Sequence, residues 1–367
     1  TDKLNGFVQE ARRMEISVEP PCVNRSQARF TVSEGRILYA LGALKGVGVE
    51  AMALVVRARA EGPFADLFEF ARRVELKALG KRALEMLASA GALDALERNR
   101  RRVFESLDRL IEYSAAHHAE KASGQASLFG GGGGSGGGEG LPPPRLAAVE
   151  DWLPSDRLGQ EHAAIGFYLS GHPLDLYADA LARKRVVTYA AFLAKAGRHG
   201  GGGRIAGTLG AMQVRKSARG NRFAYLQFSD VSGGYEVMAF SDVLMEAEPM
   251  LVPGASLVLT VETEGEDQGG RVMLRGVAPI ESVTGAAERL RVYVHEEAAM
   301  ASIAKRLEIG QSTATLARQG TGAVSLVLAL AELGQEVEVE LDGRFPVGAE
   351  IRGMLKAVPG VDAVEEV

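Results

Sequence analysis

The stretch Leu41-Gly42-Ala43-Leu44-Lys45-Gly46-Val47-Gly48 decides how the first half of the chain is interpreted. Apolar residues follow it at helical spacing, at Met52, Val55, Val56 and Ala60. Two glycines one residue apart allow a tight turn with positive φ angles and leave bare N–H groups at the start of the next helix. Such N–H groups can hold a phosphate, and Lys45 adds a positive charge beside Gly46 and Gly48. A helical bundle whose turns merely need glycine explains the stretch equally well.

A second, weaker copy of this pattern lies at Leu76-Lys77-Ala78-Leu79-Gly80-Lys81-Arg82. An apolar helical face continues it until Gly91 ends the helix. Lys77, Lys81 and Arg82 can flank a backbone phosphate. The two copies resemble helix-hairpin-helix motifs, which hold nucleic-acid backbone without reading its sequence, although Met52 stands where such motifs usually have a small residue. Each copy alone suits a plain bundle equally well, whereas two in tandem favour nucleic-acid binding.

From Arg204 the period of the hydrophobic pattern changes from 3.6 to 2, which indicates β-strands. The expected strands are Arg204–Lys216, Phe223–Asp230, Tyr235–Asp242, Ser256–Glu264 and Arg271–Val283, with a helix over 242–251. Five strands with a helix after the third are typical of an OB barrel, a fold that commonly holds single-stranded nucleic acid across one face.

Positive charge and aromatic rings gather around the first two of these strands. The segment from Arg204 to Arg222 has five basic residues and no acidic one. Rings alternate with smaller apolar residues on the second strand, so one set can fill the barrel and the other can stack on bases, but the pattern does not say which set faces outward. The candidate single-strand site consists of Arg215, Lys216, Arg219, Asn221, Arg222, Phe223 and Tyr225. A purely structural barrel is the alternative.

The bridge before the barrel and the module after it carry weaker signals. In the bridge, Glu161 and His162 are adjacent, so they diverge on a helix; packing and capping explain them better than acid–base chemistry. The segment 285–367 is expected to form a small α+β module with 8 Lys and Arg against 13 Asp and Glu, a net charge of −5. This acidic balance weakly favours docking to a protein.

Between the hairpins and the bridge, Gln125-Ala126-Ser127-Leu128-Phe129 precedes a run of glycine from Gly130 to Gly140. Such a run has no side chains to bury and is expected to be a flexible coil. Leu128 and Phe129 are therefore an apolar pair on a tether, with Gln125 and Ser127 beside them, suited to a partner's pocket. Alternatively, the pair ends a helix that starts near Arg100.

Composition excludes several classes of protein. The single cysteine, Cys22, rules out an internal disulfide or a cysteine-built zinc site, and the six histidines are scattered, so no metal site is expected. No apolar run approaches the roughly 20 residues that span a bilayer, and no signal peptide is recognised, so a cytoplasmic protein without a membrane partner is expected. The chain begins without Met, which suggests a piece of a longer protein.

In order, these segments resemble the C-terminal half of bacterial DNA polymerase III alpha subunits, which are C-family replicative DNA polymerases. The matching motifs are Pro20-Pro21-Cys22-Val23-Asn24, Leu41 to Gly48, Lys81-Arg82-Ala83-Leu84, Ser89 to Asp94, Gly166 to Pro173, and Arg219-Gly220-Asn221-Arg222 ahead of Asp230. In addition, Gln-x-x-Leu-Phe resembles the peptide by which bacterial replication proteins attach to the sliding clamp.

The resemblance implies a role for each segment. The hairpins would hold duplex DNA, the barrel single-stranded template, the peptide the sliding clamp (beta subunit), and the acidic end the tau subunit of the clamp loader. The parent would be a DNA-directed DNA polymerase whose magnesium and catalytic acids lie in an upstream palm domain, so this segment is expected to have no catalytic residue and no cofactor of its own.

Two alternatives come from other classes. An NAD-dependent DNA ligase also combines these modules but needs an adenylation lysine in a Lys-x-Asp-Gly setting and four zinc cysteines, which this sequence lacks. A free-standing, non-catalytic nucleic-acid-binding protein with the same modules stays open.

The expected fold is therefore multidomain, with α and β parts. It comprises a helical tandem helix-hairpin-helix domain, a five-stranded OB β-barrel and a small α+β C-terminal domain. The expected boundaries are 1–30 for the end of a fingers domain, 31–118 for the hairpins, 119–140 for the clamp peptide and glycine-rich linker, 141–195 for a helical bridge, 196–284 for the barrel and 285–367 for the acidic domain.

Overall fold

The computed structural model describes residues 2–123, 141–196, 200–217, 220–264, 271–285, 288–310, 321–330 and 335–367. These residues form two compact units, Thr1–Ser170 and Gly171–Val367, each of which is described by itself. The boundary falls within the expected bridge.

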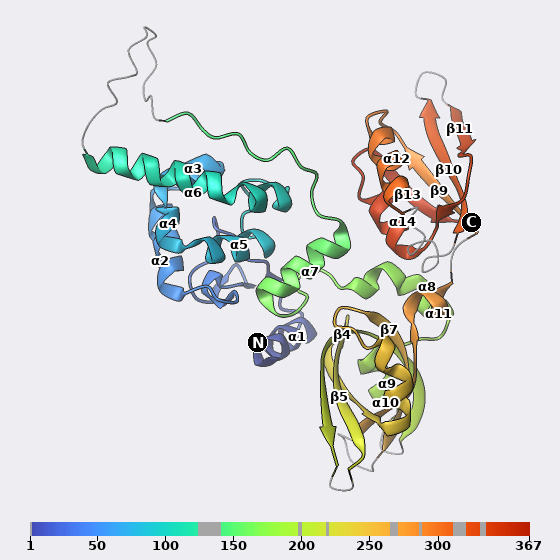
Figure 1. Ribbon diagram of the computed structural model, residues 1–367. Coiled ribbons are helices and arrows are strands. Elements are labelled where there is room, and N and C mark those ends of the chain that lie inside the picture. Colours follow the sequence, from blue (N-terminus) through green and yellow to red (C-terminus); the bar gives the residue numbers. More distant parts are fainter. Residues whose placement is uncertain are drawn as a thin grey trace. The chain divides into compact units, whose positions relative to one another are not determined.

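The first unit is mainly helical (Figure 1). Its elements are α1 (Asp2–Arg13), β1 (Val18–Glu19), β2 (Thr31–Ser33), β3 (Arg36–Leu38), η1 (Leu41–Ala43), α2 (Val49–Ala58), η2 (Arg59–Glu61), α3 (Leu67–Arg73), α4 (Leu76–Leu79), α5 (Lys81–Ser89), α6 (Arg100–Ser123) and α7 (Pro154–Ile165). The three short strands form one sheet in the order β1-β3-β2. The long helix α6 packs against α3, α4 and α5.

One apolar core holds this unit together. Tyr39, Met52, Leu84 and Leu107 are almost completely buried in it. Burying the side chains of Met52, Leu84 and Leu107 contributes roughly 1.5–3 kcal/mol each. Met52, the residue that departs from the usual hairpin pattern, therefore fills the core beneath the first turn. The element before that turn is a single 3-10 turn, η1, which follows the short strand β3.

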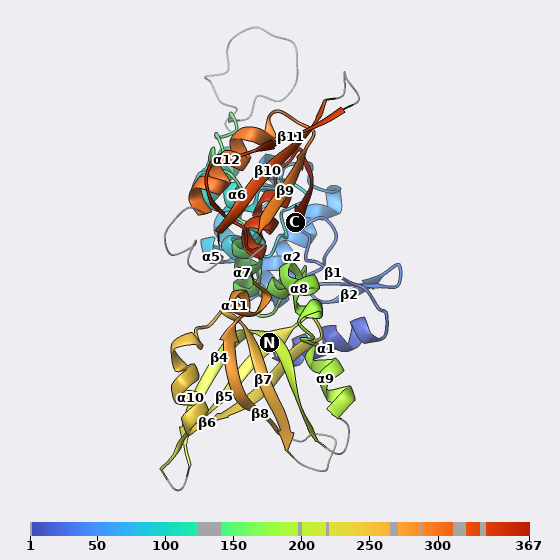
Figure 2. The same cartoon turned by 90° about the vertical axis from the view of Figure 1, so that its right-hand side faces the viewer.

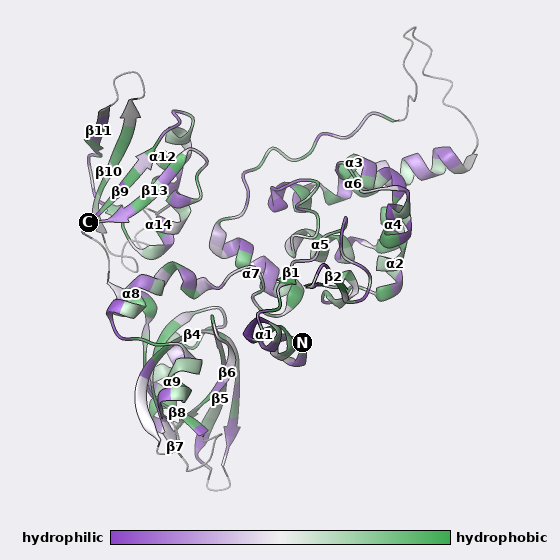
Figure 3. Ribbon diagram, turned by 180° about the vertical axis from the view of Figure 1, so that it is seen from behind, coloured by the Kyte–Doolittle hydropathy of each residue, from purple (hydrophilic) through white to green (hydrophobic). Residues whose placement is uncertain are grey.

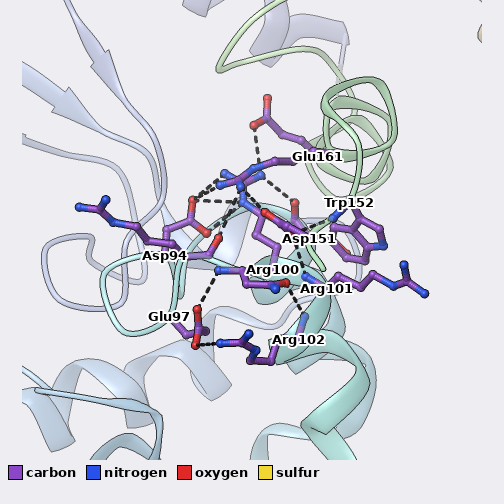
Figure 4. A network of polar contacts seen from close by, with 12 residues as sticks. Asp94, Glu97, Arg100, Arg101, Arg102, Asp151, Trp152 and Glu161 are labelled. Atoms are coloured by element: carbon purple, nitrogen blue, oxygen red, sulfur yellow. Dashed lines mark hydrogen bonds and ion pairs between the residues drawn. The ribbon is translucent and has the colours of Figure 1, made fainter. Parts of the chain in front are cut away.

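A network of ion pairs joins α7 to the start of α6 (Figure 4). Arg100 donates from Nε and Nη2 to the carboxylate of Asp94 at 2.9 Å each, and Arg157 donates to the same carboxylate at 2.9 Å. Glu161 lies 3.7 Å from Arg100 and accepts hydrogen bonds from the N–H groups of Leu169 and Ser170. Glu161 is buried, so its role is structural, as expected from the sequence. A charge buried this way needs all these partners.

The second unit begins with η3 (Pro173–Tyr177), α8 (Ala178–Arg183) and α9 (Tyr189–Ala196) and continues into a barrel (Figure 2). The barrel elements are β4 (Gly201–Lys216), β5 (Arg222–Asp230), β6 (Gly233–Phe240), α10 (Ser241–Ala247), η5 (Glu248–Met250), β7 (Ser256–Glu264), β8 (Arg271–Pro279) and α11 (Ile280–Thr284). The strands close in the order β4-β5-β6-β8-β7. All five expected strands are present; the first begins earlier than expected, and the last ends at Pro279.

Hydrophobic and hydrophilic residues are interspersed along the barrel strands (Figure 3), and one set of hydrophobic side chains fills the interior. Ala224, Leu226 and Phe228 of β5 are buried, at 0, 0 and 3% exposure. Gly203 of β4 leaves room for the ring of Phe192 from α9, because a Cβ there would lie 2.7 Å from that ring. The helix can therefore pack directly on the strand.

The chain ends in a small mixed module, whose elements are β9 (Arg289–Val294), α12 (Ala299–Gly310), β10 (Thr321–Leu330), β11 (Gln335–Glu340), β12 (Phe345–Pro346), α14 (Ala349–Lys356) and β13 (Val361–Glu366). The main sheet has the order β11-β10-β9-β13, and β12 pairs with β10. Arg289 pairs with Glu340 and Arg291 with Glu338, so part of the acidic charge is balanced within the sheet.

We predict that Gly91→Ala destabilises the first unit far more than Gly35→Ala. Both glycines have positive φ, 77° and 75°. A Cβ at Gly35 meets nothing, so that change costs about 1 kcal/mol of backbone strain. A Cβ at Gly91 collides with the Arg100 guanidinium and breaks the buried network, which should lower the free energy of unfolding by about 3 kcal/mol or more. Denaturant unfolding followed by the fluorescence of Trp152, the chain's single tryptophan, measures both; equal losses would contradict the prediction.

Candidate nucleic-acid interface

The first glycine turn leads directly into α2. Gly46 has φ +71°, and Gly48 is the N-cap residue of α2, where no side chain caps the helix. The first-turn N–H groups of a helix have no partner within it, and a glycine cap supplies no oxygen to accept from them. Lys45, Gly46 and Gly48 are exposed, whereas Val47 is buried. The turn thus exposes backbone N–H donors and a lysine, while the buried side chain of Val47 holds it against the core.

The second turn repeats this arrangement at α5. Gly80 has φ +82° and is the N-cap residue of α5, again without a side-chain cap. Lys77 on α4 and Lys81 and Arg82 on α5 are exposed. Lys81 is not free, because its Nζ lies 2.7 Å from Oδ1 of Asp108 on α6.

Arg82 brings the two turns together. A Cβ built at Gly46 would lie 3.3 Å from Nε of Arg82. The guanidinium from the second helix start therefore lies against the first turn, close to Lys45. A helix start without a side-chain cap and a guanidinium beside it can hold an anion such as a backbone phosphate.

Helix α7 supports the first turn from behind. The carbonyl of Ala164 accepts the N–H of Lys45 at 2.8 Å. On the same helix, the His162 ring lies 4.7 Å from the ring of Tyr168. Burial lowers the pKa of His162, and the nearby charge of Lys45 lowers that pKa further. The lowered pKa disfavours the imidazolium, so His162 is less prone than an exposed histidine to add charge beside the turn.

The outer face of the barrel carries rings. Phe223 and Tyr225 belong to the outward set of β5, which answers the question that alternation alone left open. Their ring centroids are 5.6 Å apart, and the Arg215 guanidinium lies 5.5 Å from the Tyr225 centroid. Phe240 of β6 stacks on Phe223 at 6.2 Å and is 43% exposed. Phe223 and Tyr225 are half-buried, and outward rings of this kind are platforms on which bases can stack.

Sequence reasoning missed Phe240. Strands β5 and β6 pair Phe223 with Phe240 and Asp230 with Gly233, so the turn is Val231-Ser232. The strands expected from the sequence end at Asp230 and resume at Tyr235, which leaves four residues between them. Assuming a two-residue turn would have fixed the register of β5 and β6 and placed the ring of Phe240 opposite Phe223.

The polar and basic residues near this face are exposed, but one of them is already held in an ion pair. Arg215, Lys216, Asn221 and Arg222 are exposed, and Arg222 forms an ion pair with Glu248 at 2.9 Å. Arg219 lies outside the described residues, as do Gln125, Ser127, Leu128 and Phe129, so these predictions stay untested.

The described part of the chain also bears on metal binding and membrane insertion. Within it, no three residues of the types His, Cys, Asp and Glu gather closely enough to hold a metal ion. None of its helices is both long and apolar enough to cross a membrane.

Known proteins resemble this chain both in one motif and over most of its length. A family model described as a helix-hairpin-helix motif matches residues 15–103, which include both glycine turns. The DNA polymerase III subunit alpha of Caulobacter vibrioides is 40% identical over 370 residues, covering 100% of this chain and 31% of that protein. The same subunit of Pseudomonas fluorescens is 33% identical over 314 residues, covering 80% of this chain and 26% of that protein. The chain thus spans less than a third of the length of these relatives.

Among solved structures, a mitochondrial single-stranded DNA binding protein from S. cerevisiae matches with a TM-score of 0.19 and 14% identity, covering 22% of this chain and 92% of that chain. At this score the likeness decides neither fold nor function.

We predict that Lys45→Gln raises the pKa of His162. Removing the lysine charge favours the imidazolium, but burial, the larger cause, persists, so the pKa should stay below its ordinary value. An NMR titration of the histidine ring protons measures this change. Lys77→Gln is the control and should leave the His162 pKa where it is; a His162 pKa insensitive to Lys45 would show that the two side chains are not neighbours.

Proposed function

The chain belongs to the family of DNA polymerase III alpha subunits, and on this premise we propose that it is the C-terminal, DNA-holding part of such a subunit. The parent would perform template-directed DNA synthesis with magnesium in a palm domain, and this part would bind and tether without catalysing the reaction. The observation that carries the proposal is the position of the Arg82 guanidinium beside the first glycine turn, where its Nε lies 3.3 Å from the place of a Cβ at Gly46, while α2 and α5 both begin without a side-chain cap.

The helical unit is proposed to hold the backbone of duplex DNA. Phosphate oxygens suit backbone N–H donors at helix starts, with Lys45 and Arg82 supplying charge. Because the proposed contacts are made to phosphates and not to base edges, the affinity should depend on salt and not on sequence. Lys77 and Lys81 would extend the same surface.

The barrel is proposed to be an OB-fold that holds single-stranded template. Phe223, Tyr225 and Phe240 would stack on bases, while Arg215 and Lys216 would contact phosphates. Arg219 and Asn221, between β4 and β5 in the sequence, and Arg222 at the start of β5 would border this path. The two modules would then hold the two kinds of DNA that meet at a primer end.

The peptide Gln125 to Phe129 is proposed to bind the sliding clamp, and the acidic C-terminal module to dock the tau subunit. Support for both comes from the family resemblance and from the sequence, because the peptide lies outside the described residues. The cytoplasmic location likewise stays a prediction.

We predict that Lys45→Gln and Arg82→Gln each weaken duplex binding to the same extent for all sequences. Each change removes a phosphate contact, so the slope of log K against log salt should become shallower by about 0.9. Fluorescence anisotropy with two unrelated duplexes at several salt concentrations measures this effect. Lys3→Gln makes the same charge change on α1, at an exposed position, and should have little effect. A loss confined to one duplex would refute contact through phosphates alone.

We predict that Tyr225→Leu and Phe240→Leu weaken binding of oligo(dT). Each change keeps apolar bulk but removes a stacking face, which is worth roughly 1–3 kcal/mol per base. Phe7→Leu replaces another exposed ring, 71% accessible on α1, and serves as the control. If the control variant loses as much affinity as the barrel variants, the rings of the barrel are not the binding surface.

We predict that replacing Leu128 and Phe129 by Ala abolishes binding to the sliding clamp and leaves affinity for DNA unchanged. A short apolar peptide should bind with a Kd of about 1 µM, roughly 8 kcal/mol. Biolayer interferometry against immobilised clamp measures this affinity, and persistent binding by the double variant would show that the clamp is held elsewhere.

A further inference from the structure

Each of the two candidate DNA surfaces has one cation already held by a carboxylate from a neighbouring helical segment. In the helical unit, Lys81 at the start of α5 lies 2.7 Å from Asp108 of α6, 27 residues further along the chain. In the barrel, Arg222 at the start of β5 lies 2.9 Å from Glu248 of η5, 26 residues further on. The same arrangement therefore occurs twice, in modules of unrelated fold.

Neither pair is built into a core. The side chains of Lys81 and Asp108 are 52 and 69% exposed, and those of Arg222 and Glu248 are 51 and 42% exposed. By contrast, the Arg100 side chain of the structural network is only 8% exposed. Exposed ion pairs contribute little to stability and open easily, because water and salt screen them. The fold does not depend on these two contacts.

A carboxylate offers a guanidinium or ammonium group the same kind of acceptor oxygens as a phosphate does. We propose that Asp108 and Glu248 are intramolecular competitors of DNA, which occupy Lys81 and Arg222 when DNA is absent and must be displaced when it binds. This inference rests on the proposed function, because it assumes that the two cations face DNA phosphates.

Competition has two consequences. Binding must first break the ion pair, and the released carboxylate then stays within a Debye length of the phosphates, about 8 Å at physiological salt, and repels them. Both effects weaken each grip. Weak binding of each cation lets it exchange between neighbouring phosphates of the DNA backbone. Such exchange suits a protein that must move along DNA while bound.

The test uses Asp108→Asn and Glu248→Gln in the whole chain. Asp108→Asn should tighten duplex binding by about threefold at low salt and steepen its salt dependence by up to about 0.9, because Lys81 then neutralises a phosphate without giving up a partner. Glu248→Gln should do the same for oligo(dT). Glu112→Gln, one turn further on α6, and Glu246→Gln on α10 are the matched controls, since both are exposed and carry the same charge change.

The double variants separate competition from general electrostatics. If the proposal holds, the gain from Asp108→Asn disappears when Lys81 is changed to Gln, and the gain from Glu248→Gln disappears when Arg222 is changed to Gln. Equal gains from the control variants, or gains that persist without the paired cation, would overturn it. Should Lys45→Gln weaken duplex binding while Asp108→Asn has no effect, the competition alone fails; absence of DNA binding by the unaltered chain defeats the proposed function itself.

Discussion

The buried guanidinium of Arg100 is the constraint on which the helical unit depends. It holds Asp94 after α5 and lies beside Glu161 of α7, and Glu161 in turn fixes the backbone at Leu169 and Ser170. With α7 held in this way, the carbonyl of Ala164 reaches the N–H of Lys45. The glycine turn is thus positioned by a network that touches no ligand. Gly91 is required because a side chain there would take the space of the guanidinium.

The two modules suit DNA for different physical reasons. The helical unit offers backbone donors at uncapped helix starts, with Arg82 from one turn lying against Gly46 of the other. The barrel offers rings on its outer face, ordered by the pairing of β5 with β6. Backbone donors suit phosphates, whereas rings suit unpaired bases. Exposed carboxylates close to both surfaces would keep each contact weak.

Local pattern predicted much of this fold. Alternating residues located the five barrel strands, because a two-residue period identifies a half-buried strand wherever the core lies. The beginning of β4 at Gly201 was missed because glycines carry no hydropathy pattern, although they pair with β7. The sequence could not show that Phe223 and Tyr225 face outward, because this depends on which side of β5 is buried. It could not place Phe240 beside Phe223, because this depends on the register of β5 and β6. The contact of Arg82 with Gly46 and the pairing of Lys81 with Asp108 join segments distant in sequence, so no local pattern could give them.

The central claim is that the two glycine turns hold duplex DNA while the outer face of the barrel holds a single strand. Hydrogen–deuterium exchange of the whole chain, with a short duplex carrying a single-stranded overhang, tests this claim most directly, because first-turn amides without an internal partner exchange fast until a phosphate accepts from them. We expect slower exchange in segments 45–51 and 80–84 with either the blunt duplex or the overhang substrate, and in segment 213–225 only when the overhang is present. Unchanged exchange at both turns, or protection confined to the C-terminal sheet, would contradict the account.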